Sequence, residues 1–132
     1  MLVLRAARPE RGRRWRILPP NAQLDGALAY ADGSHTAADI HAGVAKGTFQ
    51  EWPGDESIII TEIRETPRQR ILLFFLAAGN MTELRAMTPG ILDWGRMHGC
   101  VKAQLIGRHG WTRSWLAQAG WKETARIMER DL

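Results

Sequence analysis

The chain has 132 residues, 45% of them hydrophobic and 24% charged, with a formal net charge of +4. These proportions are ordinary for a soluble globular domain, and no run of about 18 apolar residues predicts a membrane-spanning helix. We therefore expect one domain over residues 1–132. Cys100 is the only cysteine, which excludes an internal disulfide and favours a reducing compartment.

The positive charge is concentrated towards the N-terminus. Residues 1–16 contain six arginines and one glutamate, a net charge of +5, which leaves about −1 for the rest of the chain. We expect a first strand over 2–6 and then a basic interaction arm. The residues of the arm are Arg8, Arg11, Arg13, Arg14, Trp15 and Arg16. They could contact nucleic-acid phosphates, dock on an acidic protein surface, or form a solvated face. Apolar residues precede the charged ones, the reverse of a signal peptide, so secretion by that route is not expected.

Two helices are predicted next. The apolar spacing of residues 21–31 predicts the first. The second is predicted to begin after Thr36, an N-cap with Asp39 as its capping-box partner, and to end at Gly47. Three strands follow, joined by short turns as in an antiparallel meander, and the third is the most apolar. They are predicted over 48–52, 57–65 and 70–78.

The C-terminal half is expected to start with a helix capped by Asn80. Pro89 is expected to interrupt this helix, with Thr88 capping a second segment that ends at Gly99. The remaining predicted elements are a strand over 101–105, a short helix over 112–119 and a last strand that opens at Trp121.

This half resembles the GNAT superfamily of N-acetyltransferases, in which a helix ending in W-A-x-x-x-G-C leads into a strand and then a short helix that closes on Gly-Phe or Gly-Tyr. The matching residues are Asp93, Trp94, Gly95, Gly99, Cys100, Gly120 and Trp121. The predicted element order, β-α-α-β-β-β-α-β-α-β, is also that of the superfamily. The resemblance implies an α/β (α+β) fold with a mixed, splayed β-sheet flanked by helices, whose splay would hold the pantetheine arm of acetyl-CoA.

In that superfamily a glycine-rich turn between the fourth strand and the third helix binds the pyrophosphate of the cofactor. The matching turn here offers Gly79, Asn80 and Thr82 as a reduced anion site, while Glu83 adds a negative charge to the first helical turn. The alternative is an ordinary strand–loop–helix connection with an asparagine cap. Acetyl-CoA is thus expected only if the protein is an enzyme.

The residues that carry out catalysis in the superfamily are not evident, and no catalytic residue is predicted. The general-acid tyrosine of the family corresponds to Leu116, while the only tyrosine, Tyr30, lies far away in the chain. A family asparagine corresponds to His109. Glu62 and Glu65 could act as a general base from the third strand, or could form a solvated face or salt bridge.

No metal site is predicted, because none of the histidines has zinc-ligand spacing with Cys100. His98 ends a helix, where a cation is favoured by the helix dipole, and we interpret it as a solvated helix-end residue.

The stretches TEIRETPRQRILLFFLAAGN and ILDWGRMHGC also resemble short GNAT-like proteins of tailed bacteriophages. This likeness implies a non-catalytic structural or accessory component of a phage particle, found in the virion or the host cytoplasm. Its partners would be phage structural proteins or a second copy, with nucleic acid as a further partner of the basic arm. The alternative is a divergent acyl-CoA N-acyltransferase that acts on an unknown amine.

Overall fold

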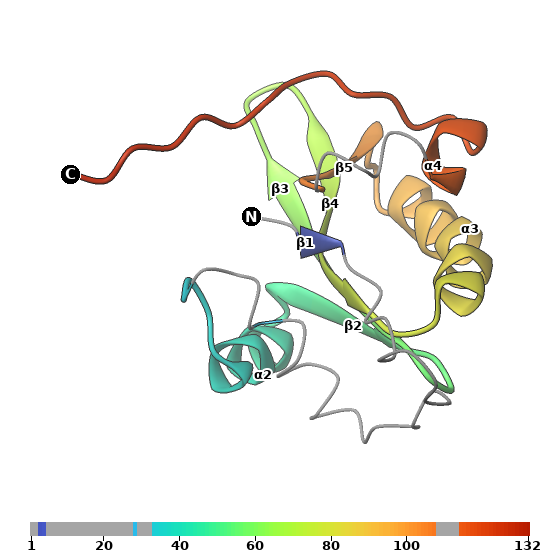
Figure 1. Ribbon diagram of the computed structural model, residues 1–132, viewed down its shortest axis with the longest axis horizontal. Helices are drawn as coiled ribbons and strands as arrows, with labels where there is room; N and C mark the ends of the chain where they lie inside the picture. The colour runs from blue at the N-terminus through green and yellow to red at the C-terminus, as the bar shows by residue number, and fades with distance from the viewer. Residues whose placement is uncertain (1–2, 5–27, 29–32, 108–113) are drawn as a thin grey trace, which may run out of the picture.

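The computed structural model describes residues 3–4, 28, 33–107 and 114–132 (Figure 1). Its elements are β1 (Val3–Leu4), α2 (Ala37–Lys46), β2 (Phe49–Pro53), β3 (Ile58–Glu65), β4 (Arg70–Ala78), α3 (Met81–Met97), β5 (Lys102–Leu105) and α4 (Trp115–Gln118). The predicted helix over 21–31 and the basic arm lie outside the described residues, except for Leu28, which is helical and buried. The predicted mixed α+β fold is confirmed.

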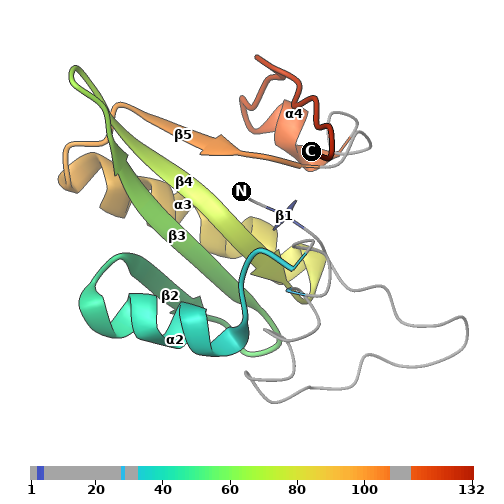
Figure 2. The ribbon, with the colours of Figure 1, turned by 90° about the vertical axis from the view of Figure 1, so that its left-hand side faces the viewer.

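The five strands that the described residues form belong to one sheet. β2, β3 and β4 form an antiparallel meander. In the pairing of β3 with β4, Ile58 lies opposite Ala78 at one end and Glu65 lies opposite Arg70 at the other, with one irregularity between Ile60 and Thr61. β3 takes one edge of β4. The other edge is shared by two parallel partners, β5 beside Ile71–Phe74 and β1 beside Leu76 and Ala77. Figure 2 shows β1 between β4 and β5. The change of partner from β5 to β1 occurs near the end of β4, next to the turn that contains the candidate site.

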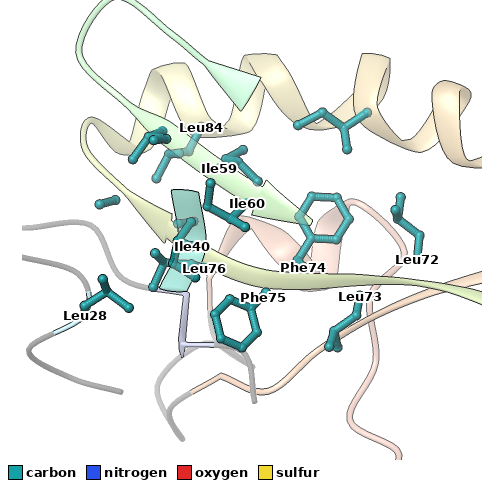
Figure 3. Packing of buried hydrophobic residues seen from close by; sticks show 14 residues of the cluster. Leu28, Ile40, Ile59, Ile60, Leu72, Leu73, Phe74, Phe75, Leu76 and Leu84 are labelled. Carbon is teal, nitrogen blue, oxygen red and sulfur yellow. The ribbon is translucent and has the colours of Figure 1, made fainter. Parts of the chain in front are cut away.

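β4 is central because it is apolar on both faces, and eight of its nine residues are buried. α3 covers one face and α2 the other (Figure 2). α3 approaches closely at Gly95, where a Cβ would lie 2.8 Å from Cδ2 of Leu72. Figure 3 shows how side chains from β3, β4, α2 and α3 meet in the core. The labelled members are Leu28, Ile40, Ile59, Ile60, Leu72, Leu73, Phe74, Phe75, Leu76 and Leu84.

The predicted start and end of α2 are confirmed. The Thr36 hydroxyl accepts a hydrogen bond from the Asp39 amide at 3.2 Å, and the Asp39 carboxylate accepts one from the Thr36 amide at 2.8 Å. This capping box satisfies two backbone donors that have no partner inside the helix. The helix ends at Gly47, which has the left-handed φ of 80° that glycine tolerates best.

The predicted interruption of α3 at Pro89 is wrong, because the helix continues from Met81 to Met97. Thr88 does not cap a second segment; it is buried, and its hydroxyl donates a hydrogen bond to the Leu84 carbonyl at 2.8 Å. Pro89 itself is exposed. A proline inside a helix leaves a backbone carbonyl without its amide partner, and at an exposed position water can bind that carbonyl. Packing of the buried face then holds the helix together across the proline.

The predicted last strand is absent. Residues 121–132 form neither helix nor strand, and β5 is one residue shorter than predicted. α4 lies within the predicted range of 112–119, whose first two residues lie outside the described part of the chain. A strand needs a neighbour for its backbone donors and acceptors, and in the described part of the chain this segment has none. Only Trp121 packs on the core, with its ring centroid 5.6 Å from that of Phe74.

No helix within the described ranges is long and apolar enough to cross a membrane.

Candidate cofactor site at the β4–α3 junction

The turn that joins β4 to α3 packs directly on the turn between β2 and β3. Gly79 is buried with a φ of +125°, a conformation that side chains disfavour. A Cβ there would lie 2.4 Å from the Glu56 carbonyl oxygen and 2.5 Å from Cα of Ser57. Both neighbours are backbone atoms, which cannot move aside independently. Glycine is therefore required at residue 79 by its contacts within the protein.

Asn80 uses its polar groups inside the protein. Its side-chain oxygen accepts from the Glu83 amide at 3.2 Å, its own amide donates to the Ser57 hydroxyl at 3.0 Å, and its carbonyl accepts from the Leu84 amide at 2.9 Å. The predicted cap is thus confirmed. Two first-turn amides, those of Met81 and Thr82, have no acceptor in the described part of the chain, and the Thr82 side chain is exposed.

Glu83 places a carboxylate at the same junction. Its two oxygens accept from the Glu56 amide at 3.1 and 3.2 Å, which links the start of α3 to the β2–β3 turn. The approach is close, since a Cβ on Gly54 would lie 1.8 Å from Oε1 of Glu83. A carboxylate in the first turn is favoured by the helix dipole. The helix N-terminus therefore already has an internal anion beside it.

The edge of β4 next to this junction is also paired. β5 follows β4 from Ile71 only as far as Phe74, and from there β1 pairs with Leu76 and Ala77. The GNAT resemblance places a pantetheine arm along this stretch of β4. In this protein β1 lies there, between β4 and the line of β5 (Figure 2).

The two candidate bases differ in their surroundings. Glu62 is half-buried on β3, opposite Phe49 and Leu73, and the described residues provide no hydrogen bond or ion pair to it. Glu65 is exposed and pairs with Arg70 at 3.1 Å. Glu62 is five residues along the ladder from the β4–α3 junction, about 16 Å at the usual rise of a strand. The carboxylate and the junction therefore form two separate places on the sheet.

The structure describes only some of the other sequence candidates. Leu116 is buried and apolar, whereas Tyr30 and His109 lie outside the described residues, as do all arm residues from Arg8 to Arg16. His98 is exposed, stacks on Trp94 at 4.1 Å and donates from Nδ1 to the Trp94 carbonyl at 2.8 Å. Its interpretation as a helix-end residue is confirmed. Across the described ranges, no three His, Cys, Asp or Glu side chains gather to hold a metal ion.

Sequence reasoning missed a shallow groove of about 540 Å³ along the outer edge of β2. It is lined by Val44, Phe49, Gln50, Glu51, Trp52, Pro53 and Trp94. Trp52 meets Trp94 edge-to-face at 5.3 Å, and its indole N–H donates to the Thr61 hydroxyl at 2.9 Å. The high tryptophan content was the only signal, and it did not indicate which tryptophans would meet.

Comparisons with known proteins support the fold. An acetyltransferase from Trypanosoma brucei has a TM-score of 0.59 and 14% identity, over 89% of this chain and 97% of that one. A point mutant of a protein from Thermus thermophilus also has a TM-score of 0.59, with 12% identity over 91% of this chain and 97% of that one. No family model and no curated protein matches the chain. The chain therefore has a GNAT-like fold, as predicted.

Proposed function

We propose that this protein is a GNAT-fold protein with a degenerate acetyl-CoA site, and that it acts as a non-catalytic structural or accessory component of a tailed phage particle or of its assembly. The observation that carries the proposal is the Glu83 carboxylate at the N-terminus of α3. That N-terminus is where the cofactor of a GNAT enzyme would place its pyrophosphate.

The electrostatic argument concerns two anions at one helix end. A pyrophosphate gains from free backbone amides and from a positive environment. Here the Glu83 carboxylate already accepts a hydrogen bond from the Glu56 amide, and the Asn80 side chain accepts one from the Glu83 amide. Two unit charges 4 Å apart near a protein surface repel by about 4 kcal/mol, which exceeds the roughly 0.3–2 kcal/mol that a helix N-terminus contributes.

The paired edge of β4 supports the same proposal. A pantetheine arm that followed β4 beyond Phe74 would have to displace β1 from Leu76 and Ala77. Each lost backbone hydrogen bond would have to be replaced by one to the ligand. The pairing of β1 thus acts against cofactor binding, in addition to the charge of Glu83.

The phage role rests on the sequence likeness to short GNAT-like phage proteins. In this role the partners are phage structural proteins or another copy of the chain, and the arginine arm docks on an acidic surface or on nucleic acid. Co-sedimentation of the protein with purified particles is the direct test. Protein that remains in the supernatant at every ionic strength would contradict a structural role.

The site itself is tested by calorimetric titration of acetyl-CoA into the full chain. We expect no measurable binding at millimolar ligand, and measurable binding after Glu83→Gln, which removes the charge and keeps the shape. Asp93→Asn removes an exposed charge from the same helix away from the junction and should change nothing. Micromolar binding by the unsubstituted protein, about −8 kcal/mol, would overturn the degenerate site.

The second candidate is a divergent acyl-CoA N-acyltransferase, and Glu62 is the observation that favours it. A half-buried carboxylate without an ion pair in the described part of the chain could accept a proton from an amine. If this alternative is right, acetyl transfer to an amine panel should be detectable. Glu62→Gln should abolish it, while Glu65→Gln, on the same strand, should leave it unchanged.

A further inference from the structure

The two ends of the sheet carry opposite charges. At one end the β2–β3 turn packs on the start of α3, and the charged side chains of residues 54–57 and 81–84 are all carboxylates. At the other end the β3–β4 turn lies beside the connection from α3 to β5 (Figure 2). These two segments are joined by hydrogen bonds from the Arg70 side chain to the His98 carbonyl and from the Val101 amide to the Arg70 carbonyl.

The second end is strongly basic. Residues 64–70 and 96–102, which we call the basic end, contain five arginines or lysines and one carboxylate, a net charge of +4 with histidine neutral. Two of the cations already have carboxylate partners, since Arg70 pairs with Glu65 and Arg96 pairs with Asp93. The other three are exposed and have no ion pair in the described part of the chain; they are Arg64, Arg68 and Lys102. The basic end therefore has positive charge available for an anionic partner.

The three available cations are spread across the end of the sheet. Arg64 on β3 and Lys102 on β5 both lie opposite Ile71 of β4. Residues opposite each other in a ladder point to the same face, so these two side chains flank Ile71 with their Cα atoms about 10 Å apart. Arg68 lies in the turn that joins β3 to β4. Such a spread suits a line of negative charges better than a single small anion.

An aromatic platform stands at the same end. His98 is exposed, and its ring stacks on Trp94 with the centroids 4.1 Å apart and the planes tilted by 31°. The hydrogen bond from Nδ1 to the Trp94 carbonyl fixes the orientation of the imidazole, and Trp52 supports Trp94 edge-to-face. In the described part of the chain no second ring stacks on His98, so the imidazole presents its other face to solvent. Two exposed apolar side chains, Met97 and Val101, also belong to the basic end.

We propose that the basic end binds single-stranded nucleic acid, with a base stacked on His98 and the phosphates on Arg64, Arg68 and Lys102. Proteins that bind single strands without sequence preference combine positive charge along the backbone with aromatic side chains on which bases stack. Positive charge alone would also attract an anionic membrane or an acidic protein, but neither needs an imidazole held with one face open. The bases of a duplex are already stacked on each other, so the open ring favours a single strand. This site lies outside the basic arm, and it depends neither on the phage role nor on the acetyl-CoA site.

The bound strand would cross the end of the sheet. Leu72 packs against α3, so Ile71 and the two cations beside it face the opposite side of the sheet. His98, just after α3, lies on the first side. A strand with a base on His98 would therefore pass the β3–β4 turn, which contains Arg68, before further phosphates reach the cations beside Ile71. Such a path takes several nucleotides, within the range of about 4–16 that an OB-fold domain binds.

The phosphate contacts are tested by fluorescence anisotropy of the full chain with a labelled oligothymidylate of about 12 nucleotides. We expect binding that weakens with salt, by a logarithmic slope of about −0.7 for each phosphate neutralised. Arg68→Gln and Lys102→Gln should each make that slope shallower by about 0.7. Lys46→Gln is the matched control, because Lys46 is exposed on α2, and it should leave the slope unchanged. No binding at low salt, or a slope that neither substitution at the basic end changes, would overturn the proposal.

The stacking contact is tested at His98. His98→Ala should weaken binding of oligothymidylate by about 5- to 150-fold, whereas His98→Phe, which keeps a flat ring, should retain most of the affinity. His41→Ala removes an exposed histidine from α2 and should change nothing. An abasic strand of the same length has the phosphates without the bases, so it should bind more weakly and be insensitive to His98→Ala. Equal binding of the two strands, or an equal effect of His98→Ala on both, would contradict stacking.

The basic arm is separated from this site in a full chain whose arm arginines are replaced by serine, namely Arg8, Arg11, Arg13, Arg14 and Arg16. That chain should still bind oligothymidylate more tightly than the abasic strand, and complete loss of binding would assign the nucleic acid to the arm instead. Oligouridylate should also bind, and the tighter of the two ligands identifies RNA or DNA. A duplex that competes as well as the single strand, or tighter binding to phosphatidylserine vesicles than to either oligonucleotide, would overturn the proposal.

Discussion

Replacement of Gly79 by alanine should strongly destabilise the protein, because two independent costs meet at this residue. The first is backbone strain, since a φ of +125° is nearly restricted to glycine and costs about 1–3 kcal/mol for other residues. The second is steric, because the new Cβ would lie 2.4 Å from the Glu56 carbonyl oxygen and 2.5 Å from Cα of Ser57. Overpacking of this kind costs about 1–3 kcal/mol. The expected loss is therefore the sum of the two, about 2–6 kcal/mol.

Two other glycines separate these costs. Gly33 has a left-handed φ of 71° and open space around it, so Gly33→Ala should lose only about 1–2 kcal/mol from strain. Gly90 is helical, exposed and equally open, so Gly90→Ala should stabilise the protein by about 0.5–1 kcal/mol.

The assay is equilibrium urea unfolding of the three variants. With a slope of about 2 kcal/mol per molar urea, Gly79→Ala should lower the midpoint by about 1–3 M. The reasoning would be refuted by a Gly79→Ala midpoint no lower than that of Gly33→Ala. Such a result would mean that the β4–α3 turn does not press on the β2–β3 turn.

Three further predictions concern local groups. Thr36→Ala should cost about 0.5–2 kcal/mol in urea unfolding, because it removes the cap of α2. The pKa of Asp39 is lowered by its hydrogen bonds with Thr36. The Asp39 carboxylate therefore contributes to stability above its unfolded-state pKa, and this contribution is lost as the pH falls through its folded-state pKa. NMR titration should show a higher pKa for Asp39 in Thr36→Ala than in the unsubstituted protein. Burial raises the pKa of the Cys100 thiol, so disulfide-exchange labelling near pH 8 should be slower than for a small free thiol and should accelerate in urea. A labelling rate equal to that of the free thiol would contradict this.

Local chemistry made much of the fold predictable. The capping box at Thr36 and Asp39 and the glycine at residue 47 define α2 without reference to the rest of the chain. The apolar run of β4 predicts a strand buried on both faces, and the structure has it so. These predictions succeed because their causes lie within a few residues of each other.

The features that the sequence did not predict depend on contacts between residues that are far apart in the chain. α3 passes through Pro89 because Leu84, Ile91 and Gly95 pack on the sheet, which outweighs a local helix breaker. The pairing of β1 with Leu76 and Ala77 joins segments about seventy residues apart, and no local pattern indicates it.

The candidate site could be predicted only in part. Gly79, Asn80 and Thr82 were identified from the chain as a reduced anion site, with Glu83 as a negative charge beside them, and the structure joins Asn80 to Glu83 by a hydrogen bond. Their partners, Glu56 and Ser57, were not identified, because which turn packs on which depends on the three-dimensional arrangement of the meander. Consequently the sequence indicated a reduced anion site at this turn, whereas the structure adds the internal hydrogen bonds that Asn80 and Glu83 make there.

The unequal edges of β4 have a consequence for the growing chain. β3 and β4 can pair as soon as residue 78 has been made, since only a short turn separates them, but the parallel partner β5 requires residues 79–105 as well. Until then the most apolar strand of the protein has one unprotected edge, which is a template for aggregation. Early pairing of β1, which is already synthesised by that time, would shield part of this edge. We therefore expect chains without residues 1–4 to give a lower soluble yield during synthesis than their equilibrium stability would predict.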